Sequence, residues 1–154
     1  MIKAIRFEKT GGSDVLHYVD YDLPPPAKGQ VQVRHSAIGV NFIDTYHRTG
    51  LYPLPLPSGL GSEAAGIVER IGPGVTCIRV GERVAYAGAG APAAYSEARV
   101  APAEKLVPLP DDVSDDVAAA ALLKGMTAEF LITARSLWSP VRPCCSTPRR
   151  AASG

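Results

Sequence analysis

Hydrophobic and polar residues alternate along the first two thirds of the chain, in short runs separated by glycine and proline. The alternation is clearest over residues 2–7, 15–21 and 30–40. A period of two predicts β-strands. Further strands are expected at residues 64–71, 84–87, 94–100 and 105–107. So many short strands, punctuated by turns, predict a β-barrel or a β-sandwich.

The pattern changes at Asn41, where aromatic and apolar residues recur at helical spacing. We therefore expect a short helix over residues 41–48. Asn41 is a suitable N-cap for this helix, and Gly50 is a suitable terminator. On spacing alone, N-capping explains Asn41 better than a binding role does.

A second change of texture begins at Ser114. This residue can cap a helix whose first turn carries Asp115 and Asp116, where the helix dipole favours negative charge. We expect Lys124-Gly125 to interrupt the helix and residues 126–136 to form another.

The composition excludes several classes of function. The chain has 154 residues, 46% of them apolar, and a net charge of +1, which gives no basic patch for nucleic acid or an anionic membrane. The longest apolar run, residues 117–123, is too short to span a bilayer. The N-terminus lacks the apolar core of a secretory signal. Three cysteines form neither a disulfide framework nor a zinc spacing, so we expect a cytoplasmic protein.

Candidate chemistry gathers between residues 39 and 66, a stretch bounded by glycines and prolines. It carries the amide of Asn41, the carboxylate of Asp44 and the phenols of Tyr46 and Tyr52. Polar groups gathered on a short, bent stretch are typical of a cleft. Plainer interpretations stay open: Tyr46 as core, Tyr52 as a loop anchor and Lys124 as an exposed helix charge.

The other reactive side chains are interpreted as structural. His17, His35 and His47 lie apart along the chain and form no catalytic pattern. Cys77 is expected to be a small buried hydrophobic residue. No glycine-rich phosphate loop is present, because Gly72-Pro73-Gly74 opens no helix.

Four segments together carry a resemblance to a known family. They are residues 39–44 (Gly-Val-Asn-Phe-Ile-Asp), 61–68 (Gly-Ser-Glu-Ala-Ala-Gly-Ile-Val), 80–84 (Val-Gly-Glu-Arg-Val) and 124–128 (Lys-Gly-Met-Thr-Ala). In order and spacing they resemble the medium-chain dehydrogenase/reductase superfamily, and within it the zeta-crystallin-like NADPH:quinone oxidoreductases.

The resemblance implies a mainly β fold with short helices. Residues 1–110 would form a GroES-like, partly open β-barrel that is the catalytic domain. Residues 111–140 would form the helical start of the interdomain and Rossmann region. In this family the cleft between the two domains holds the nicotinamide and the substrate, and full-length members are expected to be homodimers.

The resemblance also implies the site. Zinc alcohol dehydrogenases of the superfamily have cysteine where this chain has Asn41 and histidine where it has Ser62, so we predict no metal. Without zinc, a carbonyl oxygen that gains charge needs hydrogen-bond donors, and Tyr46 and Tyr52 are the catalytic candidates. Asn41, Tyr46 and Ser62 are expected to share one hollow, and Glu63 is interpreted as structural. The residues implied to bind NADPH are Asn41, Phe42, Asp44, Tyr46, Lys124 and Thr127.

The tail departs from the family. From Cys144 to Gly154 the chain has neither the buried strand nor the glycine-rich turn that the family would place here. Codons that encode the buried strand and glycine-rich turn of the family can encode this tail when they are read one nucleotide later. We therefore hypothesise a frameshift after Pro143, which the coding DNA would settle. On this hypothesis the nucleotide-binding half is missing, residues 141–154 are disordered, and the chain alone is inactive or nearly so.

The sequence thus predicts the catalytic domain of a zinc-independent NADPH-dependent quinone or enone reductase. Its expected partner is a small quinone or enone, with no nucleic acid and no membrane. Two alternatives stay open: a non-catalytic GroES-like module for binding or assembly, and a relative of the zinc-type alcohol dehydrogenases.

Overall fold

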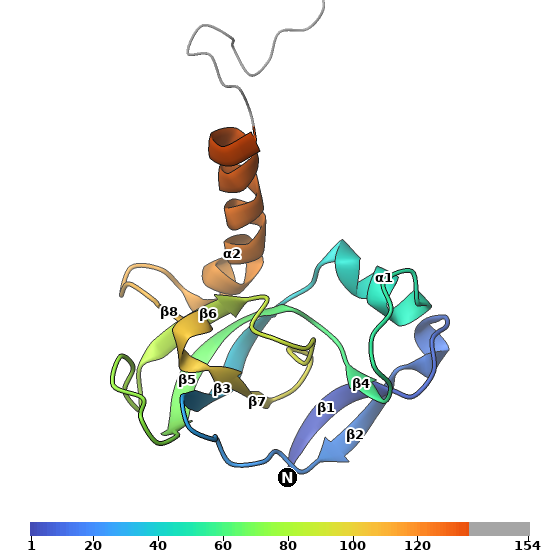
Figure 1. Cartoon of the computed structure of the whole chain (residues 1–154), viewed down its shortest axis with the longest axis horizontal. Coiled ribbons are helices and arrows are strands. Elements are labelled where there is room, and N and C mark those ends of the chain that lie inside the picture. Colours follow the sequence, from blue (N-terminus) through green and yellow to red (C-terminus); the bar gives the residue numbers. More distant parts are fainter. Residues whose placement is uncertain (136–154) are drawn as a thin grey trace, which may run out of the picture. The chain divides into compact units, whose positions relative to one another are not determined.

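The computed structural model describes residues 1–135 and divides the chain into two compact units (Figure 1). The first unit is Met1–Lys124, and the second begins at Gly125. Every strand of the described part lies in the first unit. The predicted tail, residues 141–154, lies outside the described residues.

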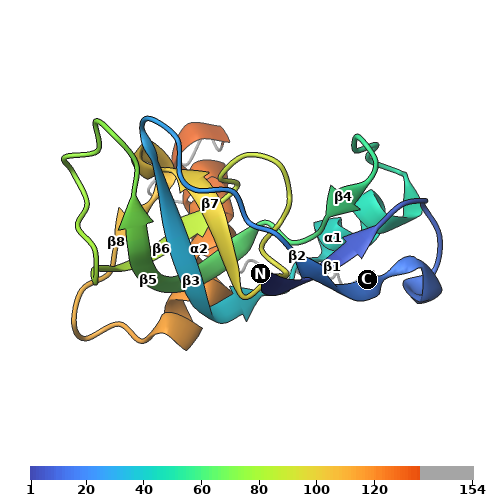
Figure 2. The ribbon, with the colours of Figure 1, turned by 90° about the horizontal axis from the view of Figure 1, so that it is seen from below.

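The strands form two antiparallel sheets. A three-stranded sheet has the order β2-β1-β4, and a five-stranded sheet has the order β7-β3-β5-β6-β8. Figure 2 shows the smaller sheet next to α1 and the larger sheet on the other side of the first unit. The strands are β1 (Ile2–Phe7), β2 (His17–Tyr21), β3 (Gln30–Gly39), β4 (Ser58–Gly59), β5 (Glu63–Ile71), β6 (Arg83–Ala87), β7 (Ala98–Pro102) and β8 (Val107–Pro108). The mainly β prediction is confirmed.

The core lies against the five-stranded sheet. Val31 and Val33 of β3 pack with Val68 of β5 and with Val84 and Tyr86 of β6, and all five are completely buried. Burying each aliphatic side chain of this size stabilises the fold by about 1.5–3 kcal/mol. These contacts fix β3 and β5, the two strands from whose ends the candidate residues come.

Helix α1 (Phe42–Thr49) confirms the short helix expected after Asn41. Asn41 is its N-cap residue, and Gly50 ends it with a φ of 86°, a left-handed conformation that favours glycine. The Gly50 N–H donates to the Tyr46 carbonyl oxygen over 3.1 Å. This short helix follows β3 directly.

Helix α2 (Asp115–Phe130) runs through Gly125, and a π-helical turn (Leu131–Arg135) follows it. The predicted break at Lys124-Gly125 is therefore wrong. A glycine within a helix lowers its stability by about 1 kcal/mol but does not end it. Gly125 is absent from the glycines with positive φ, so it keeps a conformation that continues the helix.

Three further expectations differ from the structure. The strand predicted over residues 94–100 begins only at Ala98, because the single O–H of Ser96 is shared between the carbonyl oxygens of Ala93 and Ala98 and stabilises a turn. Strand β4 was not expected after the prolines, yet it pairs with β1. Cys77 is exposed and not buried, because the core position beside it is filled by Ile78.

Within the described residues, no helix combines the length and the apolar character needed to cross a bilayer.

Candidate functional site

Glu63, the first residue of β5, is the centre of a polar cluster at the end of the barrel. Its side chain is completely buried. Its Oε2 accepts hydrogen bonds from Asn41 Nδ2 at 2.9 Å and from Lys124 Nζ at 3.3 Å. Its Oε1 accepts from the Leu123 backbone N–H at 2.5 Å. A buried carboxylate is costly unless it is paired and hydrogen-bonded, and these three donors meet that need. We call Asn41, Glu63 and Lys124 the Glu63 group.

The Asn41 side chain belongs to this group and also takes part in a capping box with Asp44 at the start of α1. Its Nδ2 donates to Glu63, while its Oδ1 accepts from Lys124 Nζ at 2.9 Å. In that capping box Asp44 Oδ2 accepts the Asn41 backbone N–H at 3.0 Å. The prediction of Asn41 as the N-cap of α1 is confirmed, and its amide nitrogen in addition faces the cluster.

Asp44 is turned into the protein, with 3% of its surface exposed. Besides the Asn41 N–H it accepts the Tyr95 hydroxyl at 2.9 Å. Burial and the adjacent Asp44 carboxylate raise the pKa of Tyr95 well above its usual range, so this phenol stays protonated and donates. Asp44 therefore links α1 to the segment before β7.

Gly39 explains how α2 comes so close to the barrel. A Cβ at this position would lie 2.2 Å from the Ala119 carbonyl oxygen and 2.7 Å from Glu63 Oε2. No side chain fits in that space, so the end of β3 packs directly on the backbone of α2. This close approach brings Leu123 and Lys124 to Glu63.

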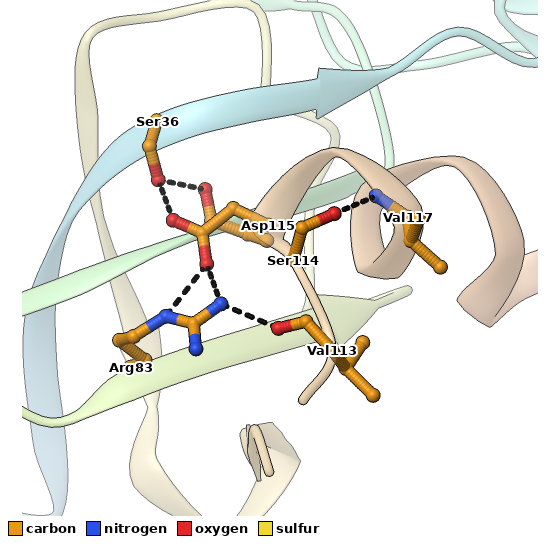
Figure 3. Close-up of polar contacts among 7 residues, drawn as sticks. Ser36, Arg83, Val113, Ser114, Asp115 and Val117 are labelled. Carbon is orange, nitrogen blue, oxygen red and sulfur yellow. Dashed lines mark hydrogen bonds and ion pairs between the residues drawn. The ribbon is translucent and has the colours of Figure 1, made fainter. Parts of the chain in front are cut away.

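The first turn of α2 is tied to the barrel at a second point (Figure 3). Asp115 accepts from the Ser36 hydroxyl of β3 and from Arg83 of β6, at 3.0 Å from Nε and 2.7 Å from the second guanidinium nitrogen. The Ser36 hydroxyl, and then Arg83, lower the pKa of Asp115. Ser114 Oγ accepts the Val117 N–H at 3.3 Å, as expected of the N-cap. These contacts orient α2, which reaches Lys124 about 2.5 turns later.

An aromatic cluster lies along α1. The ring centroids of Phe42 and Tyr46, and those of Tyr46 and Tyr52, are each 5.3 Å apart and meet edge to face. Phe42 is 73% exposed and Tyr52 is 50% exposed. Within the described part of the chain, no side chain or backbone group hydrogen-bonds the phenol oxygen of Tyr46 or Tyr52. Both hydroxyls are therefore available to a ligand.

A second polar group lies deeper in the barrel. Tyr86 Oη donates to His35 Nε2 at 2.8 Å, and His35 Nδ1 donates to the Ser96 carbonyl oxygen at 2.7 Å. Burial lowers the pKa of His35 to about 4 and raises the pKa of Tyr86 to about 12. The guanidinium of Arg99, 6% exposed, lies 5.0 Å over the Tyr86 ring and donates to loop carbonyl oxygens. We call His35, Tyr86 and Arg99 the His35 group.

The structure brings together only some of the residues implied by the resemblance. Asn41 and Lys124 meet around Glu63, whereas the aromatic residues of α1 form a separate cluster. Thr127 is exposed on α2, in the second unit. A cavity of about 320 Å³ lies beside Lys124, and neither Tyr46 nor Ser62 lines it. The hollow expected to join Asn41, Tyr46 and Ser62 stays a prediction.

The sequence analysis did not predict that Glu63 lies at the centre of the polar cluster or that Tyr95 binds Asp44. For Glu63 a signal was present, since an acidic residue opens the otherwise small and apolar stretch 64–68. A charge at the edge of a buried strand needs partners, and those partners are distant in sequence. Tyr95 gave no signal, because its partner Asp44 lies 51 residues away.

Comparisons with known proteins agree with this architecture. Residues 27–111 match the alcohol dehydrogenase GroES-like domain family. The quinone oxidoreductase of Pseudomonas aeruginosa is 55% identical over 133 residues, which cover 86% of this chain and 41% of that protein. The 2-haloacrylate reductase of a Burkholderia species is 48% identical over 139 residues, covering 86% and 41%.

A solved structure shows the same likeness. The crystal structure of Escherichia coli quinone oxidoreductase complexed with NADPH has a TM-score of 0.83 and 48% identity, over 85% of this chain and 40% of that one. The chain thus spans about two fifths of the length of the relatives that it matches. From the matched domain and the two antiparallel sheets, the chain belongs to the alcohol dehydrogenase GroES-like domain family, in the zeta-crystallin-like quinone oxidoreductase branch of the medium-chain dehydrogenase/reductase superfamily.

Proposed function

We propose that this chain supplies the substrate side of a zinc-independent, NADPH-dependent quinone or enone reductase. The observation that carries the proposal is the Glu63 group, which presents an amide and an ammonium at the position where zinc relatives bind their metal. In this proposal residues 1–110 are the catalytic domain, and residues 111–140 begin the connection to a nucleotide-binding region.

The donors of the Glu63 group fit a nicotinamide. Asn41 has a second amide N–H and Lys124 has a third ammonium N–H beyond those that bind within the group, and the Lys124 side chain is 54% exposed. These donors, with Phe42, Tyr46 and Thr127, would hold the nicotinamide end of NADPH, and Asp44 would support them by ordering the start of α1. When bound, NADPH supplies a hydride to the substrate.

In this proposal the phenols of Tyr46 and Tyr52 donate hydrogen bonds to the substrate oxygen. A quinone or enone oxygen gains negative charge as the substrate is reduced, and without a Lewis acid it needs hydrogen-bond donors. A preorganised donor of this kind contributes about 10²–10³-fold to the rate. The unpartnered hydroxyls of the two tyrosines can supply it.

Zinc does not fit the residues present. Among residues 1–135, no three histidine, cysteine, aspartate or glutamate side chains are placed to hold a metal ion. Asn41 and Ser62 are poor ligands beside thiolate and imidazole, and Glu63 is already bound by three donors. We expect metal analysis of the purified chain to find no stoichiometric zinc. One tightly bound zinc per chain would instead support a zinc-type alcohol dehydrogenase.

A chimera tests the function most sharply. The matching segment of this chain would replace the corresponding 133 residues of the Pseudomonas aeruginosa relative. We expect the chimera to oxidise NADPH with benzoquinone as acceptor, and Asn41→Ala, Tyr46→Phe and Tyr52→Phe to lower kcat/KM. Tyr18→Phe, on the exposed face of β2, is the matched control and should have no effect. A folded chimera that binds NADPH but reduces nothing would favour a non-catalytic module.

Two acceptors separate the substrate classes. The chimera would be assayed with benzoquinone and with 2-chloroacrylate, since one relative is a quinone oxidoreductase and another a 2-haloacrylate reductase. A higher kcat/KM for benzoquinone supports quinone reduction, and the reverse supports reduction of an activated alkene.

A further inference from the structure

We infer that Glu63 is a positioning residue, which fixes the orientation of the Asn41 amide and gathers Asn41 and Lys124 into one array of N–H donors for a carbonyl oxygen. The inference rests on the proposed function for the identity of the ligand. The geometric part of the inference uses only contacts among residues 1–124.

The orientation follows from which atoms can donate. An ionised carboxylate only accepts hydrogen bonds. Glu63 Oε2 therefore requires the nitrogen of the Asn41 amide, 2.9 Å away, and not its oxygen. The amide oxygen then faces the opposite way and accepts from Lys124 Nζ at 2.9 Å. Reversing the amide would set two acceptors together at Glu63 and two donors together at Lys124.

The exposure of the three side chains makes the array directional. Glu63 is completely buried, whereas the Lys124 side chain is 54% exposed. The acceptor is thus sealed inside the barrel, and the donors that it holds lie at the edge. One amide N–H and one ammonium N–H remain for a ligand. Two N–H donors held side by side are suited to a carbonyl oxygen, such as a carboxamide or quinone oxygen.

Glu63→Gln separates positioning from simple packing, because it keeps the shape and removes one acceptor. If the remaining oxygen accepts from the Leu123 N–H, the new amide nitrogen faces Asn41 and Lys124. The N–H donors at position 63 then face the N–H donors of Asn41 and Lys124, and we expect the Asn41 amide to rotate by about half a turn so that its oxygen faces position 63. The double variant Glu63→Gln/Asn41→Asp restores the match: the carboxylate at position 41 accepts from the amide at position 63 and from Lys124. It does not restore the N–H that Asn41 offers to a ligand.

The test uses the full 154-residue chain and two readouts. Nitrogen-15 NMR would follow the Asn41 side-chain amide, assigned by its absence from Asn41→Asp. Titration with reduced nicotinamide mononucleotide would give the affinity. In Glu63→Gln we expect the Asn41 amide signals to move and the affinity to fall about tenfold, equivalent to about 1.4 kcal/mol. The double variant should recover the midpoint of thermal unfolding but not the affinity.

Glu69→Gln is the matched control. Glu69 also lies on β5 and accepts from two side chains, Gln32 and Arg34, but it has no contact with the Glu63 group. Its substitution should leave the Asn41 signals and the affinity unchanged.

Unchanged Asn41 signals and unchanged affinity in Glu63→Gln, with only a lower unfolding temperature, would overturn the inference and leave Glu63 a purely structural residue. Failure of the wild-type chain to bind reduced nicotinamide mononucleotide would count against the proposed function. In that case the amide signals and the recovery in the double variant still decide whether Glu63 positions Asn41.

Discussion

The His35 group and the Glu63 group are built alike but lie at different depths. In each group one titratable side chain holds its neighbours: His35 accepts from Tyr86, over whose ring Arg99 lies, and Glu63 accepts from Asn41 and Lys124. In the His35 group the tyrosine and the arginine are themselves buried, with Tyr86 completely enclosed and Arg99 6% exposed. In the Glu63 group only the carboxylate is sealed, and the Lys124 side chain is 54% exposed.

The difference shows how one kind of interaction serves two purposes. His35 and Tyr86 make their hydrogen bonds within the barrel, and bonds of this kind specify the packing of the strands around them. A group with a sealed anchor and exposed donors keeps hydrogen-bonding capacity for a ligand. The exposure of the remaining donors, and not the residue types alone, therefore separates a structural cluster from a candidate site.

The largest expected effect concerns pH and the His35 group. Because burial holds the pKa of His35 at about 4, against 6.5 in the unfolded chain, the unfolded state binds a proton more readily. The neutral form of His35 therefore contributes its full share to the free energy of unfolding above about pH 6.5. This contribution, about 3 kcal/mol, is lost as the pH drops towards about 4. Urea unfolding from pH 7.5 to 4.5 measures it.

Two variants make the pH prediction specific. His35→Gln should flatten this part of the profile, whereas His17→Gln, at an exposed position of β2, should keep the wild-type slope. An unchanged slope in His35→Gln would show that another group causes the loss.

The next effect concerns the close contact beneath the Glu63 group. Gly39→Ala places a Cβ against the Ala119 backbone oxygen, which cannot move as a flexible side chain could. We expect the free energy of unfolding to fall by about 2–3 kcal/mol. Gly125→Ala is the control, because nothing lies within 4 Å of its added Cβ, and it should be neutral or stabilising by up to about 1 kcal/mol. Equal effects in the two variants would argue against the close packing.

A pair of tyrosine variants compares the completely buried Tyr86 with the partly exposed Tyr46. Tyr86→Phe removes the donor to His35 Nε2 and leaves that buried nitrogen without a partner, so the free energy of unfolding should fall by about 1–2 kcal/mol. Tyr46→Phe removes an unpartnered hydroxyl and should change stability by less than about 0.5 kcal/mol. Chemical denaturation of both gives the comparison, which fails if Tyr46→Phe is the more destabilising.

The smallest effect concerns the tie at the start of α2. Asp115→Asn weakens the pairing with Arg83, but both side chains are partly exposed, at 32% for Arg83 and 20% for Asp115. Pairs of this kind contribute about 0–1 kcal/mol. We expect a loss of about 0.5 kcal/mol, measured against Asp116→Asn as the exposed control. A loss above about 2 kcal/mol would mean that the tie acts as a buried pair.

Local pattern accounts for much of the fold. The sequence pattern predicted β1, β3, β5 and β6 to within a residue, and Gly50 marked the end of α1, because the information for these elements is local. The predictions that failed concern elements whose formation does not depend on local pattern. Strand β4 exists only because β1 lies beside it, and α2 continues through Gly125 because a single glycine is too weak a signal to end a helix.

The contacts of the candidate site were likewise beyond prediction from local pattern. The resemblance pointed to Asn41 and Lys124, and the structure joins them, but no local pattern could show that both bind Glu63, 22 and 61 residues away in sequence. Asp44 was expected to bind the cofactor, and its inward bond to Tyr95 depends on a partner 51 residues away. Roles for Tyr46, Tyr52, Phe42 and Thr127 stay predictions.

One measurement tests the difference between the two groups most directly: NMR titration of the full chain with reduced nicotinamide mononucleotide. We expect shifts at Asn41 and Lys124, with His35, Tyr86 and Arg99 unchanged. Shifts centred on the His35 group, or no shift in the Glu63 group at saturating ligand, would contradict it.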